Sequence, residues 1–263
     1  MRPNTVKQRL QQGEAIVSGW VGMASTLSAE IIGLAGFDCV TVDLQHGMIG
    51  FDAALPILQT LSGTPAVPLV RVPVNDGPQI MRVLDAGAYG VICPMVSTAE
   101  QARVFVSACR YPPGGSRSFG PSRGLLYGGP DYYHHADETI LTMAMIETRQ
   151  GLDNLDEILA VAGLDGVFIG PNDLSLALGQ APSSEPTSDV VVKAIEHILA
   201  RAQAHGKIPG IFCSSGAAAA MRIAQGFKFV VPGNDANILK QAANAAVNAA
   251  RSQAKATGQT SGY

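Results

Sequence analysis

Short runs of apolar residues alternate along this chain with longer stretches in which apolar residues recur every three or four positions. The short runs predict strands, at residues 15–23, 39–43, 66–71, 90–95, 144–146, 167–169, 209–213 and 228–231. The longer stretches predict helices, at residues 5–12, 26–34, 51–61, 79–85, 99–109, 152–159, 174–178, 189–205, 216–224 and 236–254. Strands that alternate with helices in this way favour a (β/α)8 barrel with a parallel sheet.

An open, doubly wound sheet is the alternative arrangement for the same pattern. Such sheets usually have fewer strands and a glycine-rich phosphate-binding turn after the first one. Here the first strand leads into V-G-M-A-S at residues 21–25, which lacks that turn. A length of 263 residues also fits one barrel, since barrels often run to about 250 residues. We therefore expect a single domain over residues 1–256 and a flexible C-terminal tail over 257–263.

The stretch from residue 111 to 139 does not fit a bare barrel. It is rich in glycine, proline and tyrosine, and it reads as one long loop between a helix and the following strand. Loops that long are usually functional or make contacts. The order of the elements places it at the amino-terminal end of the barrel, where we expect it to contact another subunit.

Composition and charge narrow the class of protein. Apolar residues make up 47% of the chain and charged residues 15%, so a large core is expected and disorder is not. The net charge is −3 and there is no basic run, which excludes nucleic acid and an anionic membrane surface as expected partners. The four cysteines match no zinc spacing, and no apolar run is long enough for a membrane span. We expect a cytoplasmic protein with reduced cysteines.

Two carboxylates follow two consecutive predicted strands. Glu147 comes directly after the strand at 144–146, and Asp173 follows the strand at 167–169, with one helix between them. A βαβ unit of this kind makes neighbouring parallel strands. The two acids then stand side by side at the carboxyl ends, where they repel each other unless a cation lies between them.

Other polar residues follow further strands, and barrel enzymes place their sites at these carboxyl ends. They are Asp43, Gln45, His46, Arg71, Cys213, Ser214, Asn234 and Asp235. Structural interpretations remain open for several of them. Asp173 and Asp235 are alternatively helix caps, and Arg71 is alternatively part of an ion pair at the rim. A buried arginine at a strand end otherwise binds a carboxylate or phosphate as a bidentate fork.

Two absences from this set also bear on the chemistry. No lysine follows a predicted strand, so a Schiff-base mechanism has no candidate. No second histidine accompanies the acids, so oxygen ligands and Mg²⁺ or Mn²⁺ are favoured over zinc.

Four short motifs together resemble the HpcH/HpaI aldolase family over nearly the whole chain. They are D-L-Q-H-G at 43–47, L-V-R-V at 69–72, M-I-E-T at 145–148 and I-G-P-N-D-L-S at 169–175. The resemblance implies a barrel of the phosphoenolpyruvate/pyruvate-binding type. It also implies that the eighth helix is exchanged between subunits of a trimer or hexamer.

The resemblance further implies a class II aldolase, which cleaves a 4-hydroxy-2-oxo acid reversibly to pyruvate and an aldehyde. A divalent cation (Mg²⁺, Mn²⁺ or Co²⁺) is expected on Glu147 and Asp173, and Arg71 is expected on the pyruvate oxygens. His46 is expected to transfer a proton. Its expected partner is Asp85, of the same or a neighbouring subunit, or Asp43, which is nearer in sequence. The remaining residues expected to bind substrate are Gln45, Gly170, Pro171, Asn172 and Leu174.

Two residues depart from the family pattern. Gln45 stands where the family often has glutamate, and Met145 stands where it often has glutamine. Gln45 removes a negative charge near the expected cation, and Met145 removes a polar contact. The alternatives are therefore a citramalyl-CoA-type lyase, a phosphonopyruvate-type enzyme, or a catalytically silent hexamer that binds metal or a 2-oxo acid.

Overall fold

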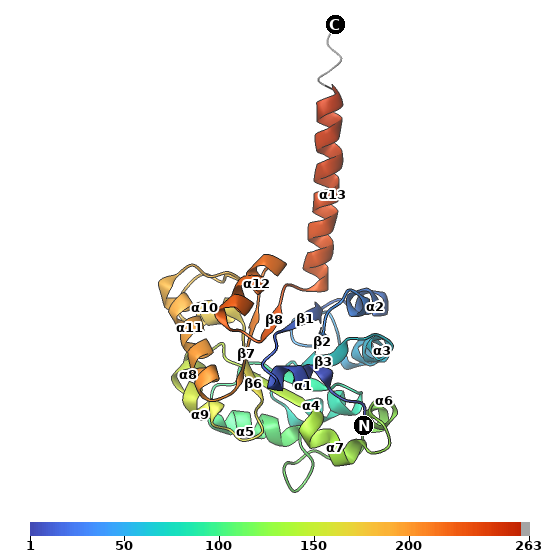
Figure 1. The fold of residues 1–263 in the computed structure, drawn as a ribbon, viewed down its shortest axis with the longest axis vertical. Coiled ribbons are helices and arrows are strands. Elements are labelled where there is room, and N and C mark those ends of the chain that lie inside the picture. Colours follow the sequence, from blue (N-terminus) through green and yellow to red (C-terminus); the bar gives the residue numbers. More distant parts are fainter. Residues whose placement is uncertain (259–263) are drawn as a thin grey trace.

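Eight parallel strands form a closed barrel in chain order in this computed structural model, which describes residues 1–258 (Figure 1). Each strand is hydrogen-bonded to the next, and β8 returns to β1. The predicted (β/α)8 barrel is confirmed. The strands are β1 (Ile16–Val21), β2 (Cys39–Asp43), β3 (Val67–Arg71), β4 (Gly90–Cys93), β5 (Leu141–Met145), β6 (Gly166–Ile169), β7 (Ile208–Phe212) and β8 (Phe229–Val231).

Helices surround the barrel, and several sites where they begin are explained by capping side chains. Ser25 and Thr98, for example, accept a hydrogen bond from a backbone N–H in the first turn of the helix that follows. The helices are α1 (Thr5–Gln11), α2 (Thr26–Leu34), α3 (Phe51–Leu61), α4 (Gly77–Asp85), α5 (Ala99–Ala108), α6 (Ser122–Gly128), α7 (Tyr132–Thr139), α8 (Arg149–Asp153), α9 (Leu155–Leu159), α10 (Pro171–Ala177), α11 (Asp189–Ala204), α12 (Gly216–Gln225) and α13 (Asp235–Gly258).

Aromatic side chains fill part of the barrel interior. The Trp20 ring stacks on Phe168 with centroids 5.8 Å apart, and it meets Phe212 edge-on at 5.6 Å. Phe168 in turn meets Phe229 at 5.9 Å. These rings come from β6, β7, β8 and β1, which are neighbours in the closed sheet, so they pack together inside one half of the barrel.

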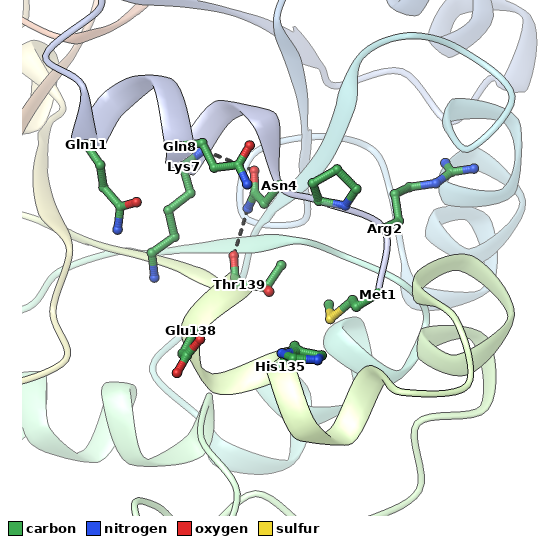
Figure 2. A pocket seen from close by; sticks show the side chains of 10 residues that line it. Met1, Arg2, Asn4, Lys7, Gln8, Gln11, His135, Glu138 and Thr139 are labelled. Carbon is green, nitrogen blue, oxygen red and sulfur yellow. Dashed lines mark hydrogen bonds between the residues drawn. The ribbon is translucent and has the colours of Figure 1, made fainter.

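Helix α1 lies across the amino-terminal end of the barrel. Asn4 donates hydrogen bonds to the carbonyls of Tyr89 and Thr139, and the buried Lys7 ammonium bonds the Ile140 carbonyl and the Asp165 carboxylate. Figure 2 shows the open pocket that this packing leaves between α1 and α7. The pocket is therefore on the opposite end of the barrel from the polar residues at the carboxyl ends of the strands.

The segment 111–139, predicted as one loop, contains the helices α6 and α7. The glycines of this segment suggested a loop, but they lie in a helix and allow it to pack closely against Tyr132. A Cβ on Gly124 or Gly128 would lie 3.0 Å or 2.6 Å from the Tyr132 ring. The predicted location at the amino-terminal end of the barrel is correct, since Gly128 accepts a hydrogen bond from the Arg2 backbone. The expected contact with another subunit stays a prediction.

Three smaller predictions differ from the structure. The single helix expected over 152–159 is two helices, α8 and α9, separated at Asn154, whose amide donates to the Ser97 carbonyl at 2.9 Å. The helix expected from residue 174 begins at Pro171. The strand expected to reach residue 95 ends at Cys93. Of the predicted tail, residues 257–258 end α13 and 259–263 lie outside the described residues.

Helix α13 projects away from the barrel (Figure 1). Side chains from residue 236 to 252 are all exposed, including those of Ile238, Leu239 and Val247. In a simple barrel, the helix after β8 packs on the sheet beside the helix after β1. Among residues 1–258, no helix is both long and apolar enough to cross a membrane.

The buried Lys7–Asp165 pair gives a testable prediction for stability. Replacing Lys7 with methionine leaves Asp165 without its closest cation and the Ile140 carbonyl without that donor. We expect a loss of about 2–3 kcal/mol in unfolding free energy, measured by urea titration. Lys193→Met, at an exposed position of α11, is the control and should change stability little. Equal effects of the two substitutions would contradict the anchoring role of Lys7.

Candidate active site

A buried ion pair joins the ends of β2 and β3. The register of the two strands places Asp43 directly opposite Arg71. Arg71 Nε donates to Asp43 Oδ1 at 2.8 Å, and Nη2 donates to Oδ2 at 2.5 Å. Only 4% of Asp43 and 8% of Arg71 is exposed, so this bidentate pair is well shielded from water. The interpretation of Arg71 as part of an ion pair is thus confirmed. Its third guanidinium nitrogen, Nη1, takes no part in the two bonds to Asp43.

Trp20 of β1 supports this pair from inside the barrel. Its indole N–H donates to Asp43 Oδ2 at 3.1 Å, and the Arg71 guanidinium lies 4.9 Å from the ring centroid. Burial alone would raise the pKa of the Asp43 carboxyl, but Arg71, Trp20 and the His46 backbone N–H outweigh it and hold the pKa below its usual value. Asp43 is therefore ionised, and it fixes the orientation of Arg71.

The loop after β2 wraps around Asp43. The backbone N–H groups of Gln45 and His46 both donate to Asp43 Oδ1, at 3.0 Å and 3.2 Å. A Cβ on Gly47 would lie 2.2 Å from the Asp43 carbonyl oxygen, so only glycine fits there. Gln45 Oε1 is buried without a hydrogen-bond donor in the described chain, so it is an acceptor that a bound hydroxyl or water could satisfy. The His46 side chain is exposed.

Glu147 follows β5 directly and is only 2% exposed. Its Oε1 accepts the Met95 backbone N–H at 2.9 Å. A Cβ on Gly170 would lie 2.5 Å from Oε2, so the absence of a side chain there makes room for the carboxylate. The pKa of Glu147 is raised to about 7, mainly by burial and also by the Asp173 charge, while the Met95 N–H and Arg71 oppose the rise. Arg71 and Asp173 are both close enough to influence this carboxylate.

Asp173 lies in the first turn of α10, where Gly170 is the N-cap residue and Pro171 begins the helix. The alternative interpretation of Asp173 as the N-cap is therefore wrong. The Leu174 N–H donates to the Gly170 carbonyl within the helix at 3.0 Å. Only Asn172 and Asp173 therefore have backbone N–H groups that lack an intrahelical acceptor by position. Of the backbone donors expected between residues 172 and 174, Leu174 is already engaged.

The pair of Glu147 and Asp173 fits a hard divalent cation in its chemistry. Both donors are carboxylates, and the repulsion between them is part of what raises the pKa of Glu147. Within residues 1–258, no group of three or more histidine, cysteine, aspartate or glutamate side chains is placed to hold an ion. A cation here would thus take its other ligands from substrate and water, which suits Mg²⁺ and Mn²⁺.

Asp85 lies at the end of α4, far along the barrel from His46. It accepts a hydrogen bond from Nη2 of the fully buried Arg117 at 2.8 Å. Burial raises the pKa of Asp85, while Arg117 opposes the rise. The structure therefore does not bring Asp85 to His46 within one chain. Asp43 contacts only the backbone N–H of His46, so neither aspartate is hydrogen-bonded to the imidazole in the described part of the chain.

The interpretation of Asp235 as the cap of the last helix is wrong, because α13 begins at Asp235 itself. Asn234 caps α13, because its Oδ1 accepts the Asn237 N–H at 2.9 Å. Asp235 is 3% exposed and accepts the Gly22 N–H at 2.9 Å and the Ser28 hydroxyl at 2.7 Å. It therefore ties the loop after β1 to the end of β8. At the end of β7, Cys213 is buried, and the Ser214 N–H donates to Glu185 at 2.9 Å.

Two contributors to the site were missed from the sequence. Trp20 is the only tryptophan of the chain and lies in the second half of the strand predicted over 15–23. Its position near the strand end was a usable signal. Met95 contributes through its backbone N–H alone, and no side-chain pattern reveals such a contact.

The raised pKa of Glu147 predicts a stability change. The usual pKa is 4.5 and the folded pKa is about 7, so the metal-free protein loses stability as pH rises through this window, on the order of 3 kcal/mol in total. Glu147→Gln removes that loss. We expect the Glu147→Gln protein to have a larger unfolding free energy than the parent at pH 8 in the presence of chelator. At pH 5 the difference should be much smaller.

The control for this experiment is Glu157→Gln on α9, where the carboxylate is exposed. It should leave unfolding free energy unchanged at both pH values. A Glu147→Gln difference that does not depend on pH would contradict the assigned burial effect.

Comparisons with known proteins show which family the chain resembles. The model of the HpcH/HpaI aldolase/citrate lyase family matches residues 17–245. A hydroxypyruvate/pyruvate aldolase from Rhizorhabdus wittichii is 46% identical over 248 residues, which are 94% of this chain and 99% of that protein. A 5-keto-4-deoxy-D-glucarate aldolase from Escherichia coli K12 is 38% identical over 242 residues, 91% of this chain and 94% of that protein.

A solved structure of similar shape supports the same assignment. A crystal structure of an HpcH/HpaI aldolase/citrate lyase family protein from Burkholderia cenocepacia superposes with a TM-score of 0.88 at 28% identity. The match covers 94% of this chain and 99% of that one. With the family model and these aldolase relatives spanning nearly the whole barrel, the chain belongs to the HpcH/HpaI aldolase/citrate lyase family.

Proposed function

We propose that this family member is a divalent-metal-dependent aldolase that cleaves a 4-hydroxy-2-oxo acid reversibly to pyruvate and an aldehyde. The observation that carries the proposal is the meeting of one guanidinium and two carboxylates at one rim. The pKa of buried Glu147 is influenced by both Asp173 and Arg71. A 2-oxo acid presents a carboxylate and a carbonyl oxygen, and its cleavage leaves negative charge on that carbonyl oxygen. The rim offers the matching positive charge.

Glu147 and Asp173 are the residues that would hold Mg²⁺, Mn²⁺ or Co²⁺. The cation, when bound, would stabilise negative charge on the 2-oxo oxygen as a Lewis acid. The chemistry of the two carboxylates supports this assignment. Glu147 is buried beside the Cα of Gly170, and a compact divalent cation would offset the repulsion between Glu147 and Asp173.

The chain's own residues supply binding and proton transfer. Arg71, held in place by Asp43 and Trp20, presents Nη1 to the developing enolate oxygen. The backbone N–H groups of Asn172 and Asp173 bind the substrate carboxylate. His46 takes the proton of the 4-hydroxyl group, the C3–C4 bond breaks, and the aldehyde leaves. The electron pair passes into the enolate, which becomes pyruvate when C3 takes a proton.

The 2-oxo half of the substrate is best assigned as pyruvate or its 3-hydroxy derivative. The similar protein from Rhizorhabdus wittichii is named hydroxypyruvate/pyruvate aldolase. The buried, unsatisfied Gln45 Oε1 supports a substrate group or bound water with a hydrogen to donate. The family often has glutamate at this position. We expect Gln45 Oε1 to accept the same hydrogen bond from substrate or water that a glutamate oxygen would accept.

A citramalyl-CoA-type lyase fits the structure less well. It needs cationic side chains for the nucleotide, and Arg117 and Arg123 are the two that the sequence offers. Arg117 is fully buried on Asp85, and Arg123 bonds the Ala86 carbonyl and the Ser62 hydroxyl. Both lie toward the amino-terminal end of the barrel, away from Glu147. A phosphonopyruvate-type enzyme and a catalytically silent hexamer remain as outcomes of the assay below.

We also propose that the protein is a homo-oligomer, a trimer or hexamer, in which α13 packs on a neighbouring copy. Support comes from the exposed apolar residues Leu239 and Val247 on the projecting helix. The outer face of α2 carries a second exposed apolar stripe, Leu27, Ile31 and Leu34, at helical spacing. Assembly would also allow Asp85 of one copy to approach His46 of another.

The cytoplasm is the compartment that we propose. All four cysteines are buried free thiols, which suits a reducing environment.

The proposed activity is tested by pyruvate release from 4-hydroxy-2-oxo acids. We expect release with Mn²⁺ or Mg²⁺ present, loss of release after chelation, and recovery when the metal is returned. Release that chelation does not affect would contradict the metal assignment. Binding of metal without any release would favour the silent hexamer, and cleavage of a phosphonate instead would favour the phosphonopyruvate-type enzyme.

Replacing Arg71 with lysine tests the role of the fork. Lysine keeps the charge but cannot make the two parallel bonds to Asp43. We expect kcat/KM to fall by roughly 10²–10³-fold, the effect of losing one preorganised donor to the transition state. Arg82→Lys, at an exposed position of α4, is the control. A rise in KM alone, with kcat unchanged, would contradict the role in enolate stabilisation.

A further inference from the structure

Met95 has an unusual backbone conformation immediately beside the proposed metal ligands. It is the only non-glycine residue with positive φ among residues 1–258, at 57°. Non-glycine residues avoid this region because Cβ crowds the backbone. Such conformations persist only where the surroundings enforce them, and they cluster at functional sites. Met95 follows β4 by two residues, at the same rim as Arg71 and Glu147.

Hydrogen bonds on both sides of Met95 hold this turn against the end of β5. The Met95 N–H donates to Glu147 Oε1 at 2.9 Å, and the Val96 N–H donates to the Met145 carbonyl at 3.2 Å. The Ser97 hydroxyl contacts the Met95 carbonyl at 3.3 Å and the Thr148 hydroxyl at 2.7 Å. The turn thus bonds Met145, Glu147 and Thr148, which are at or within two residues of position 147.

The Met95 N–H leaves the two oxygens of Glu147 in different surroundings. Oε1 is held by this N–H, while Oε2 lies against Gly170, three residues before Asp173. The methionine side chain is 52% exposed and lies in a shallow pocket with Val74 and Val104. The side chain is therefore not needed for the contact, and the conformation of the backbone is what matters.

We propose that Met95 is a positioning residue, whose left-handed backbone directs its N–H to Glu147 Oε1 and leaves Oε2 oriented for the cation. The inference rests on the metal site of the proposed function. The strained turn holds a metal ligand in its binding orientation before the metal arrives, so its effect is on metal affinity. A turn that served only folding would affect stability and leave metal affinity unchanged.

The test is the dissociation constant of Mn²⁺ without substrate, by titration calorimetry, for substitutions that differ in tolerance of positive φ. Met95→Gly and Met95→Asn accept this conformation, so we expect affinity within about twofold of the parent. Met95→Val disfavours it because of the β-branch, and we expect affinity at least roughly tenfold weaker. Urea unfolding in chelator, run in parallel, checks that each variant is folded.

Met48→Val is the matched control. Met48 is another exposed methionine in a loop after a strand, its N–H also donates a hydrogen bond, and its φ is not positive. It should bind Mn²⁺ like the parent. Replacing residue 95 with the α-hydroxy acid analogue of methionine removes only the N–H, and should weaken Mn²⁺ binding as Met95→Val does.

Three results would overturn the inference. They are parent-like affinity in Met95→Val, parent-like affinity in the α-hydroxy acid variant, and a tenfold loss in Met95→Gly, which would implicate the side chain instead. In each of these the parent binds Mn²⁺, so the proposed function survives. A parent protein that binds no Mn²⁺ would overturn both.

Discussion

The burial of the Glu147 carboxylate is the constraint on which the rest of the site depends. A carboxylate that is 2% exposed, with one backbone donor and a second acid nearby, is costly to ionise. Three neighbouring features make room for this carboxylate or stabilise its charge. Gly170 makes room, the turn at Met95 supplies an N–H, and Arg71 contributes charge. The closed barrel makes this possible because its register brings the ends of β2, β3, β5 and β6 to one rim.

In the other half of the site, at the ends of β2 and β3, the charges of Asp43 and Arg71 neutralise each other. Asp43 and Arg71 face each other across β2 and β3, share two hydrogen bonds and rest on Trp20. This pair is rigid and holds its charges regardless of a ligand, whereas Glu147 and Asp173 form a pair of like charge. The asymmetry divides the work in the proposed aldolase. Asp43 orients the Arg71 guanidinium toward the substrate, and Glu147 and Asp173 attract a metal cation from solution.

The sequence predicted the barrel because alternating strands and helices are a property of the chain itself, and seven of the predicted strand positions needed only end adjustments. It also predicted which side chains stand at the rim, because strand ends are local features. It failed where contacts join different elements of the fold. Gly124 and Gly128 suggested a loop, yet they allow α6 to approach Tyr132. Asp235 looked like a cap until its contacts with Gly22 and Ser28 were known. The backbone role of Met95 leaves no trace in side-chain pattern.

If Glu147 and Asp173 form a preorganised site for a divalent cation, Mn²⁺ binding to the protein should release protons. Because the pKa of Glu147 is about 7, Mn²⁺ binding at pH 7 should displace a fraction of a proton per chain. We expect one Mn²⁺ per chain, proton release that falls toward zero by pH 9, and loss of Mn²⁺ binding in Glu147→Gln. Release that is unchanged between pH 7 and pH 9, or Mn²⁺ binding that persists in Glu147→Gln, would contradict the assignment of Glu147 and Asp173 as the cation site.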